Sequence, residues 1–77
     1  MNQEINTKQS PAFLKIRLAA LEKAFNQVRN MRILLDEKLD RGHLSQEDYS
    51  RSINVLVAEG VQIRAEQARI ESALGIS

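Results

Sequence analysis

A chain of 77 residues forms at most one small domain. It has no cysteine and one histidine, so it can form no disulfide and lacks the usual ligands of structural zinc. We expect no metal and no cofactor. The net charge is +1, with six Lys or Arg against two Glu in residues 1–34 and three against six acids in residues 35–60. This division predicts one basic and one acidic end, but the weak net field is no sign of a nucleic-acid partner.

Residues 1–9 are polar and contain no apolar run. The segment lacks the apolar core of a signal peptide, and no stretch of the chain approaches the length of a membrane span. We therefore expect a flexible polar tail over residues 1–9, no membrane partner and a cytoplasmic location.

The first helix is predicted over about residues 11–41. Ser10 followed by Pro11 is typical of an N-cap and a first helical position, where proline needs no N–H. Gly42 is suited to end the helix in a left-handed conformation. Apolar residues recur at alternating spacings of four and three, which predicts a coiled-coil seam with one polar position: Leu14, Leu18, Leu21, Phe25, Val28, Arg32, Leu35 and Leu39.

The sequence GHLSQEDY after this helix contains a helix stop and a helix start, with the turn at 42–45. Ser45 stands at the N-cap of the second helix, and Asp48 is placed to reach back to it in a capping box. Leu44 and Tyr49 occupy the two positions of a hydrophobic staple. The pattern predicts a tight connection between two helices.

The second helix is predicted over about residues 46–74, and its seam repeats the same spacing: Tyr49, Ile53, Leu56, Gly60, Ile63, Gln67, Ile70 and Leu74. In an antiparallel hairpin, the residue numbers of two opposite positions add up to the same value for every pair. The two seams meet this condition at every pair, from Leu39 opposite Tyr49 to Leu14 opposite Leu74. We therefore predict an all-α fold, an antiparallel two-helix hairpin of coiled-coil type over residues 10–77.

Three seam positions depart from the apolar pattern. Gly60 is predicted to lie opposite Val28 and beside Phe25, where the missing side chain gives the ring room despite the low helix propensity of glycine. Arg32 and Gln67 are polar, and we expect them to fix the register or extend to solvent instead of binding a ligand.

A second set of apolar residues lies beside each seam. We expect these residues to form the partner interface: Phe13, Ile16, Ala20, Ala24, Met31 and Leu34 on the first helix, and Val57, Val61, Ala65 and Ala68 on the second. They are displaced from their seams in opposite rotational senses, which puts the two stripes on opposite broad faces of the hairpin. We expect such hairpins to assemble into a four-helix bundle or a larger oligomer.

The turn sequence LDRGHLSQEDY looks like the turn of short bacterial C-terminal helical-hairpin modules, in which glycine, an aliphatic residue, Ser or Thr, two acids and an aromatic follow one another. The likeness covers about residues 35–56. The overall plan is similar to the small subunit of exonuclease VII, to the plasmid copy-number hairpin that binds RNA as a dimer, and to small co-chaperones of type III secretion needles. These likenesses imply a helical-hairpin architecture and assign no family.

The sequence contains no pattern typical of catalysis, and we expect neither an enzyme nor a protein with a small-molecule substrate. His43 is predicted to be a solvated loop residue. The function we predict is a protein–protein interaction module, an adaptor, co-chaperone or assembly subunit, with a homo-oligomer or a helical protein as partner. The alternative is a nucleic-acid-binding hairpin whose phosphate contacts would be Lys15, Arg17, Lys23, Arg29 and Arg32.

Overall fold

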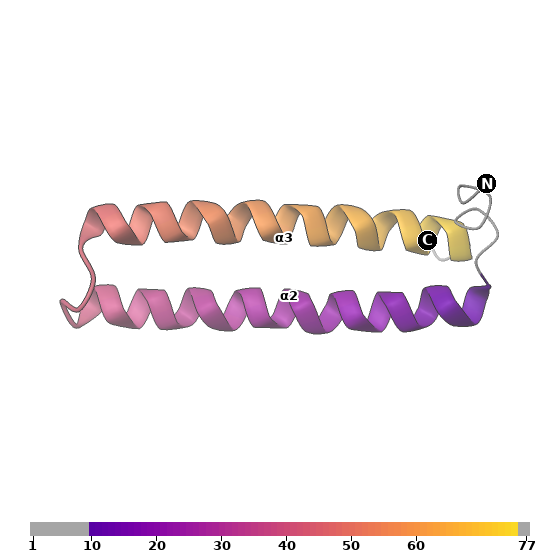
Figure 1. Cartoon of the computed structure of the whole chain (residues 1–77), viewed down its shortest axis with the longest axis horizontal. Coiled ribbons are helices and arrows are strands. Elements are labelled where there is room, and N and C mark those ends of the chain that lie inside the picture. Colours follow the sequence, from indigo (N-terminus) through magenta and orange to yellow (C-terminus); the bar gives the residue numbers. More distant parts are fainter. Residues whose placement is uncertain (1–9, 76–77) are drawn as a thin grey trace.

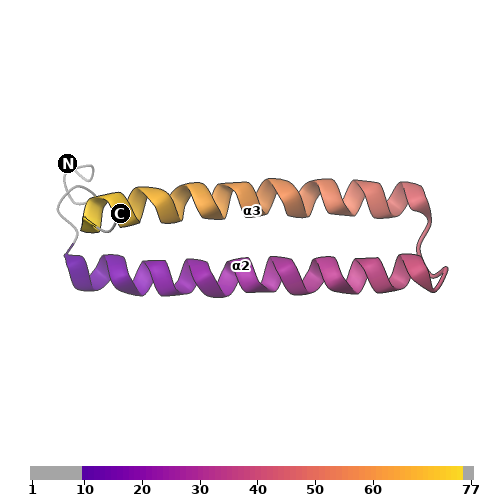
Figure 2. The ribbon, with the colours of Figure 1, turned by 180° about the vertical axis from the view of Figure 1, so that it is seen from behind.

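A computed structural model describes residues 10–75 of the chain. Helix α2 (Pro11–Asp40) and helix α3 (Gln46–Leu74) run antiparallel and pack side by side along their whole length, joined by one short turn (Figure 1). The reverse view shows the same two-helix arrangement (Figure 2). The predicted all-α hairpin is confirmed, whereas the predicted tail at 1–9 lies outside the described residues.

The start of α2 follows the predicted capping chemistry. Ser10 is extended, and its hydroxyl oxygen accepts a hydrogen bond from the backbone N–H of Phe13 at 3.1 Å. Pro11 takes the first helical position, where its fixed φ fits the helix. These two residues therefore determine where the helix begins.

The end of α2 forms a Schellman motif, which closes the helix within two residues. The backbone N–H of His43 donates to the carbonyl of Lys38 at 2.8 Å, and that of Gly42 donates to the carbonyl of Leu39 at 3.1 Å. Gly42 has a φ of 76°, a left-handed conformation that costs a residue with a Cβ about 1 to 2 kcal/mol. Arg41 is the C-cap, so α2 ends at Asp40, one residue before its predicted end.

The start of α3 has half of the predicted capping box. The Ser45 hydroxyl accepts from the backbone N–H of Asp48 at 3.1 Å, as predicted. The Asp48 carboxylate does not accept the reciprocal bond from the backbone N–H of Ser45. That carboxylate instead accepts from the Arg51 guanidinium at 3.2 Å, because the two residues are one helical turn apart. The Tyr49 hydroxyl donates across the turn to the Asp36 carboxylate at 2.5 Å.

The core is the line of contact between the two predicted seams. Every seam residue is buried or half-buried except Arg32, which is exposed. Leu21 and Ile70 are 5% and 7% exposed, and Gln67 is equally buried at 5%. The Gln67 side chain donates to Glu22 at 3.2 Å and accepts from Arg64 at 2.8 Å, so its burial leaves no polar atom unpaired.

The predicted register is confirmed at the middle of the hairpin. A Cβ built on Gly60 would lie 3.7 Å from Cε1 of Phe25 and 4.0 Å from Cγ1 of Val28. Gly60 therefore faces the residues that the antiparallel pairing requires. Both distances are ordinary van der Waals contacts, so a methyl group would also fit beside the ring.

Candidate interaction surface

The hairpin leaves many large apolar side chains in water. They range from 47% exposed at Val57 to 68% at Ile16, and they are Phe13, Ile16, Met31, Ile33, Leu34, Val55, Val57 and Val61. Six of them belong to the predicted stripes. The three stripe alanines at 20, 65 and 68 are also exposed, and Ala24 is half-buried. The sequence analysis did not include Ile33 and Val55 in the predicted interface. The helical repeat places each of them on the side of its helix that faces away from the predicted stripe.

Two grooves run along the hairpin, one on each side of the core. Val28 and Leu56 line both grooves, so the grooves flank the same seam contacts. We call the sides the Met31 face, with a groove of about 810 Å³, and the Val61 face, with a groove of about 400 Å³. Ala24 and Met31 of the first predicted stripe line the Met31 groove, and Val57 and Val61 of the second line the Val61 groove, so these parts of the stripes lie on opposite faces.

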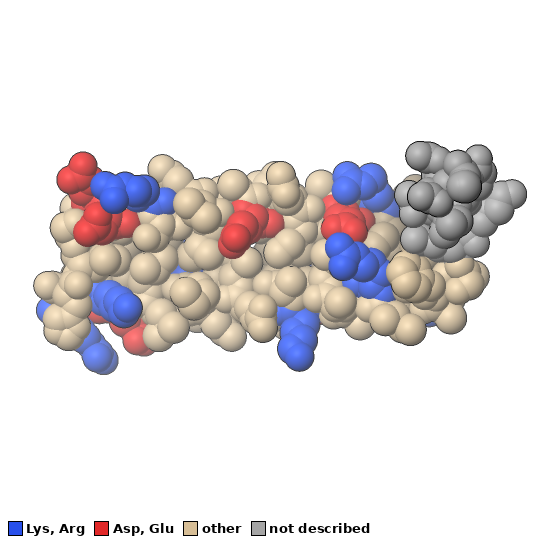
Figure 3. Space-filling view, viewed as in Figure 1, with Lys and Arg blue, Asp and Glu red and all other residues tan. Residues whose placement is uncertain are grey.

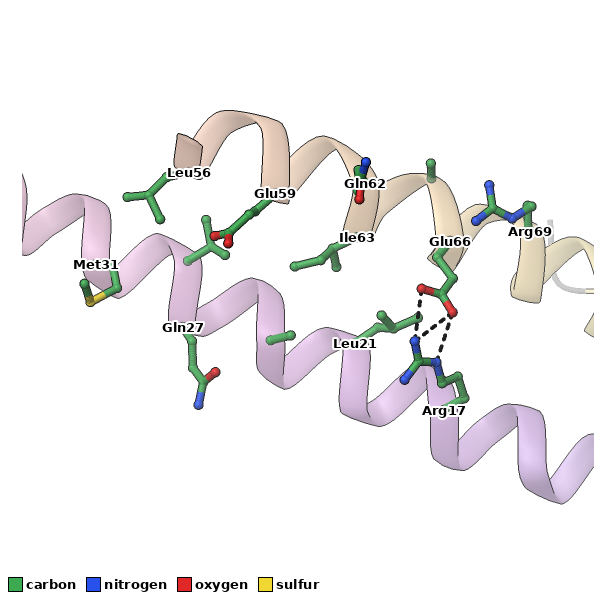
Figure 4. A pocket seen from close by; sticks show the side chains of 13 residues that line it. Arg17, Leu21, Gln27, Met31, Leu56, Glu59, Gln62, Ile63, Glu66 and Arg69 are labelled. Carbon is green, nitrogen blue, oxygen red and sulfur yellow. Dashed lines mark hydrogen bonds and ion pairs between the residues drawn. The ribbon is translucent and has the colours of Figure 1, made fainter. Parts of the chain in front are cut away.

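The Met31 face carries apolar residues among balanced charges. Figure 4 shows Leu21, Leu56 and Ile63 pointing from opposite helices toward the space between them. The groove is also lined by the stripe residues Ala24 and Met31 of α2 and by Ala65 of α3. Ala65 was expected on the opposite face with Val61. It lies here because four helical residues make slightly more than one turn, and the stripe drifts around α3.

One bidentate ion pair crosses the Met31 face. The Nε of Arg17 donates to Glu66 at 3.0 Å and its Nη2 to the other carboxylate oxygen at 3.2 Å, as the dashed lines in Figure 4 show. The groove also contains Arg69 and Glu59, so its two basic and two acidic side chains balance. The half-exposed pair stabilises the hairpin by at most about 1 kcal/mol, but it fixes how the two helices face each other.

The Val61 face has an apolar floor and a basic rim. Phe25 and Val28 of α2 meet Val57 and Val61 of α3 around Gly60, which has no side chain to fill the groove. The three charged residues that line this groove are all arginines: Arg29, Arg32 and Arg64. No carboxylate within residues 10–75 lines it, in contrast to the Met31 face.

Arg64 is the most constrained of these arginines. Its guanidinium carbon lies 3.6 Å from the centroid of the Phe25 ring, a cation–π contact. The same guanidinium donates to Gln67 at 2.8 Å and lies 3.9 Å from the Glu22 carboxylate. These contacts hold the positive charge over the apolar floor of the groove.

The five predicted phosphate contacts do not share one surface. Arg17 lies on the Met31 face, whereas Arg29 and Arg32 line the Val61 groove. Lys15 lines a smaller hollow that also contains Glu22 and Glu71, and Lys23 lines none of these hollows. Basic groups are accordingly scattered along both helices with acidic groups between them (Figure 3). Among the described residues, Arg17 is the only one of the five that pairs with a carboxylate.

The turn contains the chain's one histidine, and an unusual tyrosine follows near the start of α3. His43 is exposed, and its backbone, not its ring, caps α2. The hydrogen bond to Asp36 raises the pKa of the Tyr49 hydroxyl above its ordinary value, and partial burial and the negative charge of Asp36 add to the shift. Within residues 10–75, no group of three or more His, Asp or Glu side chains is placed to hold a metal ion.

Neither α2 nor α3, the helices of the described residues, combines the length and hydropathy that crossing a bilayer requires. No known protein family matches the sequence, and no curated protein or solved structure matches it either.

Proposed function

We propose that this chain is a non-catalytic protein–protein interaction module that acts through the apolar residues on its two broad faces. In this role it self-associates, covers a helix of a larger partner, or does both, as an adaptor, co-chaperone or assembly subunit does. The observation that carries the proposal is the ratio of exposed to buried apolar groups. Within residues 10–75, only Leu21 and Ile70 are nearly buried apolar side chains, whereas eight large ones are 47% exposed or more.

The balanced charges of the Met31 face favour self-association there. In a two-fold dimer, the same surface patch of each copy faces that patch of the other copy, so each charged side chain lies near the charged side chains of an identical patch. The Met31 face has two arginines and two glutamates, and a two-fold axis lets the arginines of one copy meet glutamates of the other. The product is an antiparallel four-helix bundle in which Met31 and Leu34 become core residues.

The shape of both grooves supports a docking role over catalysis. They are open to solvent along the hairpin, and catalytic sites depend on concave pockets that exclude water. Their lining is mainly apolar, with charges at the edges, which is the usual composition of a protein interface.

The test is sedimentation velocity of the full chain over a micromolar concentration series. We expect the wild type to sediment above its monomer mass of 8.7 kDa, and Met31→Glu with Leu34→Glu to sediment as a folded monomer. The matched control, Val57→Glu with Val61→Glu, adds the same charge to the opposite face and should still assemble. A wild-type chain that stays a folded monomer, or a control variant that dissociates equally, would overturn self-association through the Met31 face.

A further inference from the structure

The Val61 face differs from the Met31 face in ways that point to a different occupant. We propose that this groove binds an acidic amphipathic helix of another protein. The apolar side of that helix lies on Val57 and Val61, and its carboxylates pair with Arg29, Arg32 and Arg64. The inference rests on the proposed function and adds the chemistry of the partner.

The shape of the groove fits a helix. Its lining runs from Phe25 to Arg32 on α2 and from Leu56 to Arg64 on α3. These segments are about 11 Å long at 1.5 Å per residue, which matches two turns of a docked helix. Gly60 lies in the middle, where any other seam residue would fill the space. A methyl group fits there without a clash, so the packing of the hairpin does not require glycine at this position.

The charge of the groove selects an acidic partner. Three arginines line it without a carboxylate among the lining residues, and Arg29 and Arg32 are one helical turn apart, so their like charges oppose each other. The two neighbouring acids are engaged within the hairpin. Glu22 accepts from Gln67 and also pairs with Arg64 at 3.9 Å, and Asp36 accepts from Tyr49. Arg29 and Arg32 are therefore the arginines of the rim without an ion pair among the described residues. Carboxylates from outside the hairpin would therefore relieve the repulsion at the rim.

The same charges disfavour the other occupants. A second copy docked by a two-fold axis through this face would put three arginines against three arginines. Single-stranded nucleic acid binds by stacking its bases on open aromatic rings, and the one aromatic ring of this groove, Phe25, is covered by the Arg64 guanidinium. An amphipathic helix is the ligand that uses both the apolar floor and the basic rim.

The experiment is fluorescence anisotropy of the full chain with two labelled synthetic helices of about 18 residues. One has a leucine stripe flanked by glutamates, and the other has the same stripe flanked by lysines. We expect the wild type to bind the glutamate helix at least about tenfold more tightly than the lysine helix. Arg29→Glu with Arg32→Glu should reverse that preference.

Two variants test whether the groove itself is the site. Lys23→Glu with Arg41→Glu makes the same change in net charge outside the groove and should keep the preference of the wild type. Gly60→Leu fills the groove without a change in charge and should weaken binding of the glutamate helix about tenfold or more. Circular dichroism of each variant confirms that it is folded.

Three results would overturn this proposal. The first is that the wild-type chain does not bind the glutamate helix. If the same chain still self-associates in sedimentation velocity, the proposed function stands without this partner. The second is equal loss of binding in the Lys23 and Arg41 control. The third is binding of a single-stranded RNA as tight as that of the peptide and unaffected by Val57→Ser with Val61→Ser, which would identify a general anion site.

Discussion

Gly60 and Gly42 have opposite energetic roles, which their backbone angles decide. Gly42 has a positive φ, whereas Gly60 lies inside α3 and has no such conformation. A glycine inside a helix costs stability because it loses more backbone entropy on folding than alanine does. Gly60 therefore weakens α3, and in the proposed docking site its benefit is the open groove.

We predict that Gly60→Ala raises the free energy of unfolding by about 1 kcal/mol. The new Cβ meets Phe25 and Val28 at ordinary contact distances, so no strain offsets the gain in helix propensity. Urea denaturation measures it. Gly42→Ala is the matched control, and it should lower the free energy of unfolding by about 1 kcal/mol because φ is 76° there. Equal effects at both positions would contradict this explanation.

Tyr49 provides a direct probe of the turn, because it is the only tyrosine of the chain. Its hydroxyl donates to Asp36 in the folded state, which raises its pKa. The resulting stabilisation is complete below the ordinary tyrosine pKa of about 10 and is lost as the pH rises through the higher pKa of the folded state.

We predict that ultraviolet titration of the phenolate gives a midpoint above the value measured in urea. Asp36→Asn should bring the folded midpoint down toward the unfolded one, because the negative acceptor is gone. In denaturation experiments, Tyr49→Phe should lose less stability than the wild type between about pH 9 and pH 12. A folded midpoint equal to the unfolded one would show that the bond to Asp36 is absent in solution.

At the scale of the elements, the turn is determined by backbone capping and not by side-chain chemistry at His43. The Schellman motif uses the N–H of His43 and the conformation of Gly42, and α3 begins at the hydroxyl of Ser45. The imidazole ring makes no hydrogen bond to another described residue.

We predict that Ser45→Ala lowers the free energy of unfolding by about 1 kcal/mol, whereas His43→Ala changes it very little. The serine variant loses the acceptor for the Asp48 N–H, and the histidine variant keeps its capping N–H. Thermal melts followed by circular dichroism at 222 nm compare the two. A destabilisation by His43→Ala as large as that of Ser45→Ala would assign the ring a role that the structure does not show.

At the scale of the whole molecule, the hairpin has one narrow core and two unequal faces. The Met31 face has balanced charges, and the Val61 face has a basic rim. A molecule of this kind can use one face for its own copies and the other for a different protein. If the chain assembles as we propose, its stability depends on assembly, because association stabilises only the folded state.

We predict that the melting temperature of the wild type rises with protein concentration. The reason is mass action, since dilution separates the copies and exposes the apolar residues of the Met31 face. Differential scanning calorimetry over a concentration series measures the rise. Met31→Glu with Leu34→Glu should melt at a temperature independent of concentration, and the same independence in the wild type would show that it folds alone.

The two helices, their register and the caps at Ser10, Gly42 and Ser45 were predictable from the amino-acid sequence, whereas the partner of the Asp48 carboxylate was not. Ser10, Gly42 and Ser45 act through bonds to residues a few positions away, and the seam spacing follows from the helical repeat, so both are visible in a linear pattern. The sequence also placed Ala24 and Met31 on the face opposite Val57 and Val61, whereas it placed Ala65 on the wrong face. The oligomeric state and the function predicted from these stripes stay predictions.

How charges and apolar groups combine on each face depends on the packing of the two helices and could not be predicted from the sequence. The pairs Arg17 with Glu66 and Tyr49 with Asp36 join different helices, and no local pattern predicts which long side chains meet. The cation over Phe25 and the all-arginine rim of the Val61 groove likewise combine residues from α2 and α3. A groove exists only where two helices meet, so its shape and charge depend on both sequences at one level of the hairpin.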